Sequence, residues 1–149
     1  MLNRGTIYGG TQMWFRKVYE SLIKTQKMIA AVRPGDRTKP GSHSYNPMNT
    51  PMPIRIIKRP GTGYQQPGED TVFIQPELEP DDGTTIQIVG CYAKPLGMVT
   101  VDDLRGCAPD SARPELAAYH LGMIYDRLPL GEEEIVTIWR WEYLPKASE

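Results

Sequence analysis

The chain is poor in the residues that mark several protein classes. Its 149 residues include only 2 cysteines and 2 histidines. Cys91 and Cys107 are too few and too far apart for a disulfide framework or a cysteine-based zinc site. His43 and His120 are also far apart in the sequence and are not accompanied by other ligand residues. We therefore expect neither a metal site nor a cofactor.

Long apolar stretches are missing as well. No run approaches the roughly 20 apolar residues of a membrane-spanning helix. Residues 1–10 lack the apolar core of a signal peptide. The expectation is a cytoplasmic protein with reduced thiols and no membrane contact.

Acidic residues are almost absent from the first part of the chain. Residues 1–65 hold 11 basic residues and only two acidic ones, Glu20 and Asp36, whereas residues 66–149 hold 6 basic and 16 acidic residues. The formal net charge of −1 hides this sorting. The uneven distribution of charge has two explanations. Either the basic part binds an anionic partner, with nucleic acid the commonest candidate, or the two parts neutralise each other within one fold.

The composition is typical of a globular chain rich in loops. Hydrophobic residues make up 40%, and 14 glycines and 14 prolines favour turns. The length predicts one domain. We expect a flexible lead-in over residues 1–12 and a single domain over residues 13–145. A long loop rich in proline and glycine, at about residues 34–53, would interrupt that domain, and loops of this length are usually functional or mobile.

Two helices and one helical turn are predicted. The spacing of Trp14, Val18 and Leu22 predicts a helix over residues 14–27. A second helix is predicted over residues 111–126, with Pro114 in its first turn. Thr100 is expected to cap a single helical turn over residues 101–104.

Short β-branched and apolar segments predict strands over residues 28–32, 54–58, 71–75, 85–93 and 134–144. In the last of these, alternation places Trp139, Trp141 and Tyr143 on one face of the strand. Strands do not alternate regularly with helices, which disfavours a doubly wound parallel sheet. The predicted fold class is α+β, a small and mostly antiparallel β-barrel or curled sheet flanked by two helices.

The order of several short motifs in the sequence is similar to that of a known family. Leu22-Ile23-Lys24-Thr25 leads into a strand that ends at Arg33, and the turn Pro34-Gly35-Asp36 follows. Later, the strand over residues 86–89 leads through Pro95-Leu96 to the predicted turn at residues 101–104, and residues 136–143 form a closing strand. This layout resembles the ASCH domains of the PUA-like superfamily over most of residues 14–144. The resemblance implies a PUA-like β-barrel with a ligand cleft near residues 24–39.

The densest basic segment supplies the candidate binding residues. They are Lys24, Thr25, Lys27, Arg33 and Arg37. Lysine and arginine there would neutralise phosphates, and Arg33 could form paired hydrogen bonds to a phosphate or a base edge. The predicted partner is RNA, single-stranded nucleic acid or a nucleotide-like ligand. The alternative is a solvated basic face.

Two aromatic residues are candidates for stacking on a base. Tyr64 follows the basic pair Lys58 and Arg59 in a glycine-rich turn. Trp141 is the second candidate, although a strand face that carries two tryptophans more often belongs to a core.

An enzymatic alternative follows from the amidohydrolase members of the resembling family. The resemblance implies a lysine, Lys24 or Lys27, acting with Glu115 to hydrolyse an amide on an acylated nucleoside. However, Ala31 stands where those members carry a polar residue, which favours holding a ligand over transforming it. Glu115 has a simpler interpretation as a helix-dipole partner. A third hypothesis is a non-enzymatic assembly or regulatory protein, such as a homo-oligomer, with complementary charged surfaces.

Overall fold

The computed structural model describes residues 12–39, 48–61, 76–124 and 129–146. The element order is β1 (Met13–Arg16), η1 (Lys17–Tyr19), α2 (Glu20–Lys24), β2 (Ala30–Pro34), β3 (Pro51–Arg59), β4 (Glu77–Leu78), β5 (Thr85–Pro95), η2 (Leu96–Met98), η3 (Pro109–Ser111), α3 (Pro114–Ile124) and β6 (Ile135–Tyr143). The predicted strand over residues 71–75 lies outside the described residues, as does nearly all of the predicted lead-in. Within the described ranges, no helix is long and apolar enough to cross a membrane.

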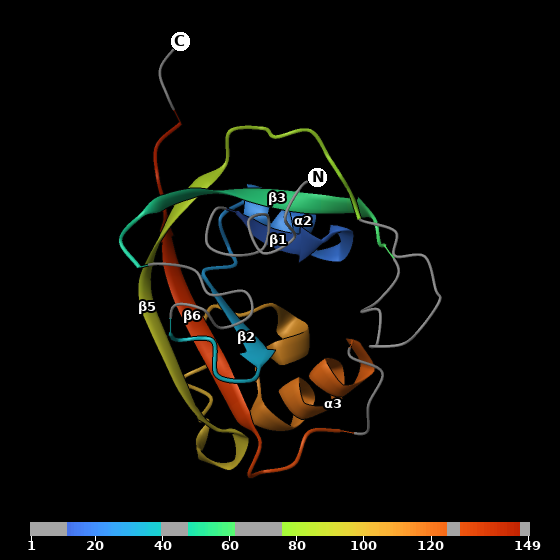
Figure 1. The fold of residues 1–149 in the computed structure, drawn as a ribbon, viewed down its shortest axis with the longest axis vertical. Helices are drawn as coiled ribbons and strands as arrows, with labels where there is room; N and C mark the ends of the chain where they lie inside the picture. Colours follow the sequence, from blue (N-terminus) through green and yellow to red (C-terminus); the bar gives the residue numbers. More distant parts are fainter. Residues whose placement is uncertain (1–11, 40–47, 62–75, 125–128, 147–149) are drawn as a thin grey trace.

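One mixed sheet holds the molecule together (Figure 1). Its strand order is β1-β3-β5-β6-β2, with β4 paired to β3. The β1–β3 pair is parallel and the other pairs are antiparallel. In Figure 1, β3 runs across the top of the molecule while β5 and β6 descend from it, so the sheet is strongly curled. The prediction of a mostly antiparallel α+β fold is confirmed.

Of the two predicted forms, a β-barrel and a curled sheet, the structure has the curled sheet, and the barrel is wrong. Between the two terminal strands, β1 and β2, no backbone pairing occurs among the described residues, so the sheet stays open. A side chain bridges the opening instead. The Arg33 guanidinium on β2 donates to the carbonyl oxygen of Trp14 on β1 at 2.8 Å and lies 5.3 Å from the centre of the Phe15 ring.

The predicted helix over residues 14–27 is also wrong in its first part. Met13, Trp14 and Phe15 are all buried and form a strand that pairs with β3. Successive side chains of a strand point to opposite faces, so both faces of β1 are covered. Val18, which the helical stripe placed in the core, is 65% exposed. Helical backbone occurs only over Lys17–Tyr19 and Glu20–Lys24.

The second helix and the capped turn follow the prediction more closely. α3 begins at Pro114, whose missing N–H costs nothing at a helix start. Thr100 and Asp103 form a reciprocal cap: the Asp103 N–H donates to Thr100 Oγ1 at 3.2 Å, and the Thr100 N–H donates to Asp103 Oδ2 at 2.8 Å. The segment after this cap is a hydrogen-bonded turn rather than a helix.

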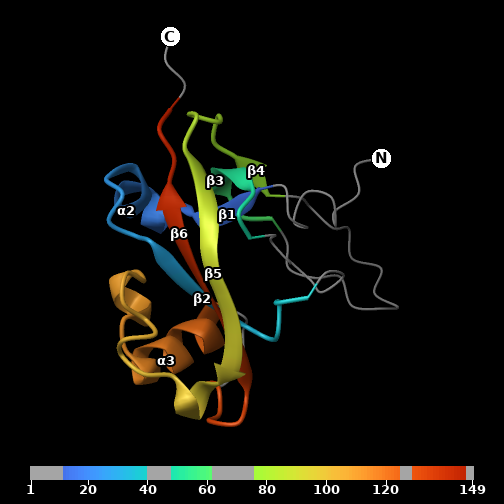
Figure 2. The same cartoon turned by 90° about the vertical axis from the view of Figure 1, so that its left-hand side faces the viewer.

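Strand β6 separates two hydrophobic clusters. Trp139 and Trp141 belong to a cluster that contains residues of β1, α2, β3 and β5. Val136 and Ile138, on the other face of the strand, pack with residues of η2 and α3. The predicted alternation of β6 is therefore confirmed, and both of its faces are covered. Figure 2 shows α2 and α3 lying on the same side of the β5–β6 pair, one above the other.

Candidate ligand site

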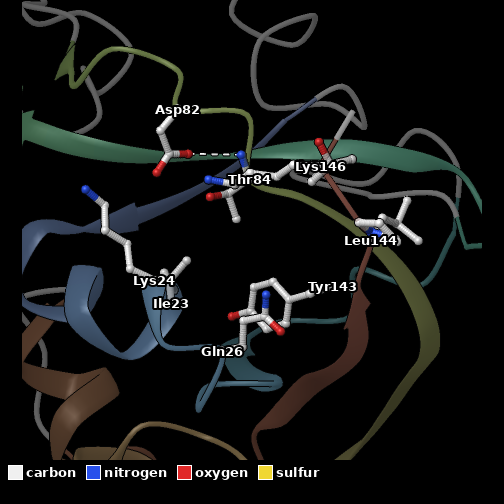
Figure 3. A pocket seen from close by; sticks show the side chains of 10 residues that line it. Ile23, Lys24, Gln26, Asp82, Thr84, Tyr143, Leu144 and Lys146 are labelled. Carbon is white, nitrogen blue, oxygen red and sulfur yellow. Dashed lines mark hydrogen bonds between the residues drawn. The ribbon is translucent and has the colours of Figure 1, made fainter. Parts of the chain in front are cut away.

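A hollow of about 260 Å³ lies where α2 and β6 both end, next to the turn that leads into β5 (Figure 3). Its wall combines charged, polar and apolar side chains. The lining residues are Ile23, Lys24, Gln26, Asp82, Thr84, Thr85, Tyr143, Leu144, Pro145 and Lys146.

The chain reversal after α2 places Lys24 and Gln26 on this wall. Gln26 adopts a left-handed backbone with φ of 60°. The N–H groups of Lys27 and Met28 both donate to the carbonyl oxygen of Leu22, at 2.8 and 3.2 Å, and so hold the reversal. The Tyr143 hydroxyl donates to the carbonyl oxygen of Met28 at 2.6 Å, which fixes the aromatic wall of the hollow.

The turn before β5 supplies a fixed carboxylate. Asp82 Oδ1 accepts the N–H of Thr84 at 2.9 Å, and Asp81 Oδ1 accepts the N–H of Gly83 at 2.9 Å. Burial opposes the ionisation of Asp82, but the hydrogen bonds from Thr84 and the charges of Lys146 and Lys24 outweigh it, so its pKa lies below the ordinary value. The hollow therefore presents two ammonium groups and one ionised carboxylate.

The predicted basic residues are only partly brought to this hollow. Lys24 lines it and lies 3.6 Å from Glu20. Thr25 and Lys27 are exposed nearby in the chain, and the Thr25 hydroxyl donates to the carbonyl oxygen of Ser21 at 2.7 Å. Neither Thr25 nor Lys27 lines the hollow.

Arg33 and Arg37 lie at a different end of the fold. Arg33 pairs in register with Thr137, whereas the hollow lies at Tyr143, about 20 Å further along β6 at 3.3 Å per residue. Arg37 is buried, its N–H donates to Thr137 Oγ1 at 2.9 Å, and its Nε donates to the carbonyl oxygen of Pro34 at 2.9 Å. The single cleft expected for Lys24, Arg33 and Arg37 is thus not formed, because both arginines are engaged at the β2–β6 end.

Of the two aromatic candidates, only one can be placed. Tyr64 lies outside the described residues. Trp141 is 2% exposed, and its ring centroid lies 5.6 Å from that of Phe15. Trp141 is therefore a core residue, and no face of its ring is open for stacking on a base.

The predicted catalytic pairing is not assembled. Glu115 is exposed in the first turn of α3 and lies 3.2 Å from the Arg113 guanidinium. In the described part of the chain, neither Lys24 nor Lys27 forms an ion pair with Glu115. The arrangement matches the helix-dipole interpretation of Glu115.

Within the fold, acidic residues of the later part of the chain neutralise some of the positive charge of residues 1–65. Lys17 in the basic part pairs with Glu79 in the acidic part. Lys58 and Arg59 lie 3.7 and 3.4 Å from the Glu77 carboxylate. These three cations lie on η1 and β3, and none of them lines the hollow.

Two functional groups of the hollow were missed by sequence reasoning. Lys146 and Asp82 both stand far from Lys24 in the sequence, so no local pattern joins the three residues. The one local signal was Asp81-Asp82-Gly83 directly before a strand, a pattern typical of side chains that hydrogen-bond the backbone two residues on.

A second polar cluster was also missed. The Tyr19 hydroxyl lies 2.7 Å from Asp110 Oδ2 and 2.6 Å from His120 Nε2. Burial, and then the neighbouring Asp110, raise the pKa of Tyr19, while burial lowers the pKa of His120.

The two cysteines are free, and burial raises the pKa of Cys107 to about 12, which keeps its thiol protonated. Among the described residues, no group of three His, Cys, Asp or Glu side chains could hold a metal ion.

No protein-family model matches the chain, and no curated protein matches its sequence. Among solved structures, it is similar to an ASCH domain from Lactobacillus crispatus JV V101, with a TM-score of 0.46 and 9% sequence identity. The superposition covers 95% of this chain and 86% of the other. At this identity and TM-score the likeness is distant.

Proposed function

We propose that the chain binds a nucleotide-like anion, one unit of a single-stranded nucleic acid, in the hollow beside Lys24. The observation that supports this proposal is the pairing of Lys24 and Lys146 with an apolar and aromatic wall that includes Ile23 and Tyr143. Ammonium groups bind phosphate as point charges, and an aromatic wall suits a nucleobase.

The size of the hollow favours a single unit over a duplex. Its volume of about 260 Å³ is near the lower end of ligand pockets, which span about 300–1,000 Å³. A duplex would need a long basic surface, and the cations Lys17, Lys58 and Arg59 do not line the hollow. A strand end or an unstacked nucleotide fits better.

The test is a titration of a labelled single-stranded oligonucleotide at several salt concentrations, read by fluorescence anisotropy. We expect affinity to fall with salt because bound phosphates release counterions. Lys24→Ala and Lys146→Ala should each weaken binding and reduce the salt slope by about 0.7, the value for one phosphate contact on a single strand.

Lys58→Ala is the matched control. The side chain of Lys58 is 48% exposed and that of Lys24 is 54% exposed, but Lys58 pairs with Glu77 outside the hollow. Its substitution should leave affinity and salt slope unchanged. Absence of binding at low salt, or equal losses in all three variants, would contradict a site in this hollow.

A further inference from the structure

Asp82 is an unexpected residue in a site for an anion. Its carboxylate lines the same hollow as Lys24 and Lys146. Figure 3 shows one carboxylate oxygen joined to Thr84 and the other directed away from Thr84, on the side of the hollow where Lys24 lies. An ionised carboxylate there repels a phosphate, so a simple anion site would be better without it.

The charge pattern restricts the chemistry of the ligand. An ionised carboxylate only accepts hydrogen bonds, and a lysine ammonium only donates them. A ligand that satisfies all three groups carries a negative group for the lysines and a separate donor for Asp82. Inorganic phosphate and sulfate at neutral pH lack a suitably separated donor. A ribonucleotide has both, since its ribose hydroxyls donate at a distance from its phosphate.

We propose that Asp82 accepts a hydrogen bond from the ribose 2′-hydroxyl and thereby makes the hollow select RNA over DNA, an inference that rests on the proposed function. The 2′-hydroxyl is the donor that RNA has and DNA lacks. Acidic side chains hold ribose hydroxyls in the same way in dinucleotide-binding folds.

The turn fixes Asp82 before a ligand arrives. Two consecutive aspartates each accept a backbone N–H two residues on, and Gly83 supplies the left-handed backbone with φ of 86° that the turn requires. The side chain of Asp82 therefore gives up little freedom on binding, which raises the contribution of each contact to affinity.

The test compares two oligonucleotides of the same sequence, one RNA and one DNA. We expect the unmodified protein to bind the RNA about 10-fold more tightly, the effect of one hydrogen bond to a charged group. Asp82→Ala should bring the ratio close to one, mainly by weakening RNA binding, while DNA affinity holds or rises because a negative charge is gone.

Asp81→Ala is the control for the turn itself. Asp81 forms the same kind of bond, to Gly83, but does not line the hollow, so this variant should keep the RNA preference. Asp82→Asn is a second variant that retains an oxygen for the Thr84 N–H and loses the charge, and it should also lose the preference.

The outcomes separate the two proposals. If neither oligonucleotide binds the unmodified protein, the proposed function fails and this inference with it. If both bind equally while Lys24→Ala still weakens both, the proposed function stands and the role of Asp82 is overturned. The role of Asp82 is equally overturned if Asp81→Ala abolishes the preference as fully as Asp82→Ala does.

Discussion

At the scale of single residues, Asp103 has the most hydrogen-bond partners of any carboxylate in the described part of the chain. It accepts from the Tyr92 hydroxyl at 2.8 Å, from Lys94 Nζ at 2.7 Å and from the N–H of Thr100 at 2.8 Å. Burial opposes its ionisation, but these bonds dominate and lower its pKa to about 2. Asp103 therefore ties β5 to the turn that follows η2.

Asp103→Asn should lower the free energy of unfolding by about 2 kcal/mol at neutral pH. The reason is a folded-state pKa of about 2 against an ordinary value of 3.8, at about 1.4 kcal/mol per unit. Because the folded pKa is the lower one, this stability is present above pH 3.8 and is lost as pH falls through about 2. Urea unfolding at several pH values should show the gap between protein and variant closing toward acid.

Asp102→Asn is the neighbouring control. The side chain of Asp102 is 81% exposed and pairs with Arg105 at the surface. An exposed pair of this kind contributes little, so the variant should stay within about 0.5 kcal/mol of the unmodified protein. A pH-independent gap for Asp103→Asn would contradict the role given to its ionisation.

At the scale of elements, the first segment of the domain is the most informative. β1 pairs in parallel with β3, so Met13–Arg16 are held by residues 54–57. Phe15 is 4% exposed, whereas Val18, three residues later, is 65% exposed. In a helix over the whole segment, Val18 would be buried and Phe15 would be exposed.

Phe15→Ala should lower the free energy of unfolding by about 3–5 kcal/mol, the usual cost of removing a buried aromatic ring. Val18→Ala should change it by less than about 0.5 kcal/mol, because its side chain faces solvent. Urea unfolding of both variants is the measurement. A larger loss for Val18→Ala than for Phe15→Ala would favour the continuous helix.

The contrast between β6 and β1 explains what the sequence could predict. β6 shows its alternation within nine residues, so a local pattern was sufficient for it, and a local pattern also predicted α3, although α3 begins at Pro114 rather than at residue 111. The strand identity of β1 depends on β3, which follows about 40 residues later, and no local pattern reports such a partner. The site follows the same rule: Lys24 was found from its basic segment, whereas Lys146 and Asp82 join it only through folding.

At the scale of the whole molecule, one polar cluster links the first and last thirds of the chain. Tyr19 in η1 contacts Asp110 in η3 and His120 in α3. His120 Nε2 also lies 3.3 Å from Asp110 Oδ2. Burial lowers the pKa of His120, Asp110 opposes this effect, and Arg16 adds to it.

This cluster predicts that stability falls in mild acid. The unfolded chain protonates His120 near its ordinary pKa of 6.5, whereas the folded protein protonates it only at lower pH. The unfolded state therefore binds more protons below pH 6.5, and the free energy of unfolding decreases as pH falls through that range. Urea midpoints at about pH 7.5 and about pH 5.5 measure the decrease, with the buffer range chosen around the ordinary histidine pKa.

His120→Asn should make the two midpoints more similar. The chain has 2 histidines, and His43→Asn measures the part of the decrease that comes from the other one. If His120→Asn keeps the full decrease and His43→Asn removes it, the assignment to the Tyr19 cluster is wrong.

Among the described residues, the two terminal strands of the curled sheet each lack a partner on one edge, which has a consequence for the behaviour of the protein in concentrated solution. An unpaired strand edge is a template on which another chain can add a strand. Arg33 occupies the Trp14 carbonyl oxygen, a group that an incoming strand would use, and places its positive charge at that edge. Pro34 leaves β2 with one N–H fewer at the opposite edge. We therefore expect Arg33 and Pro34 to disfavour the addition of a strand from another copy of the chain.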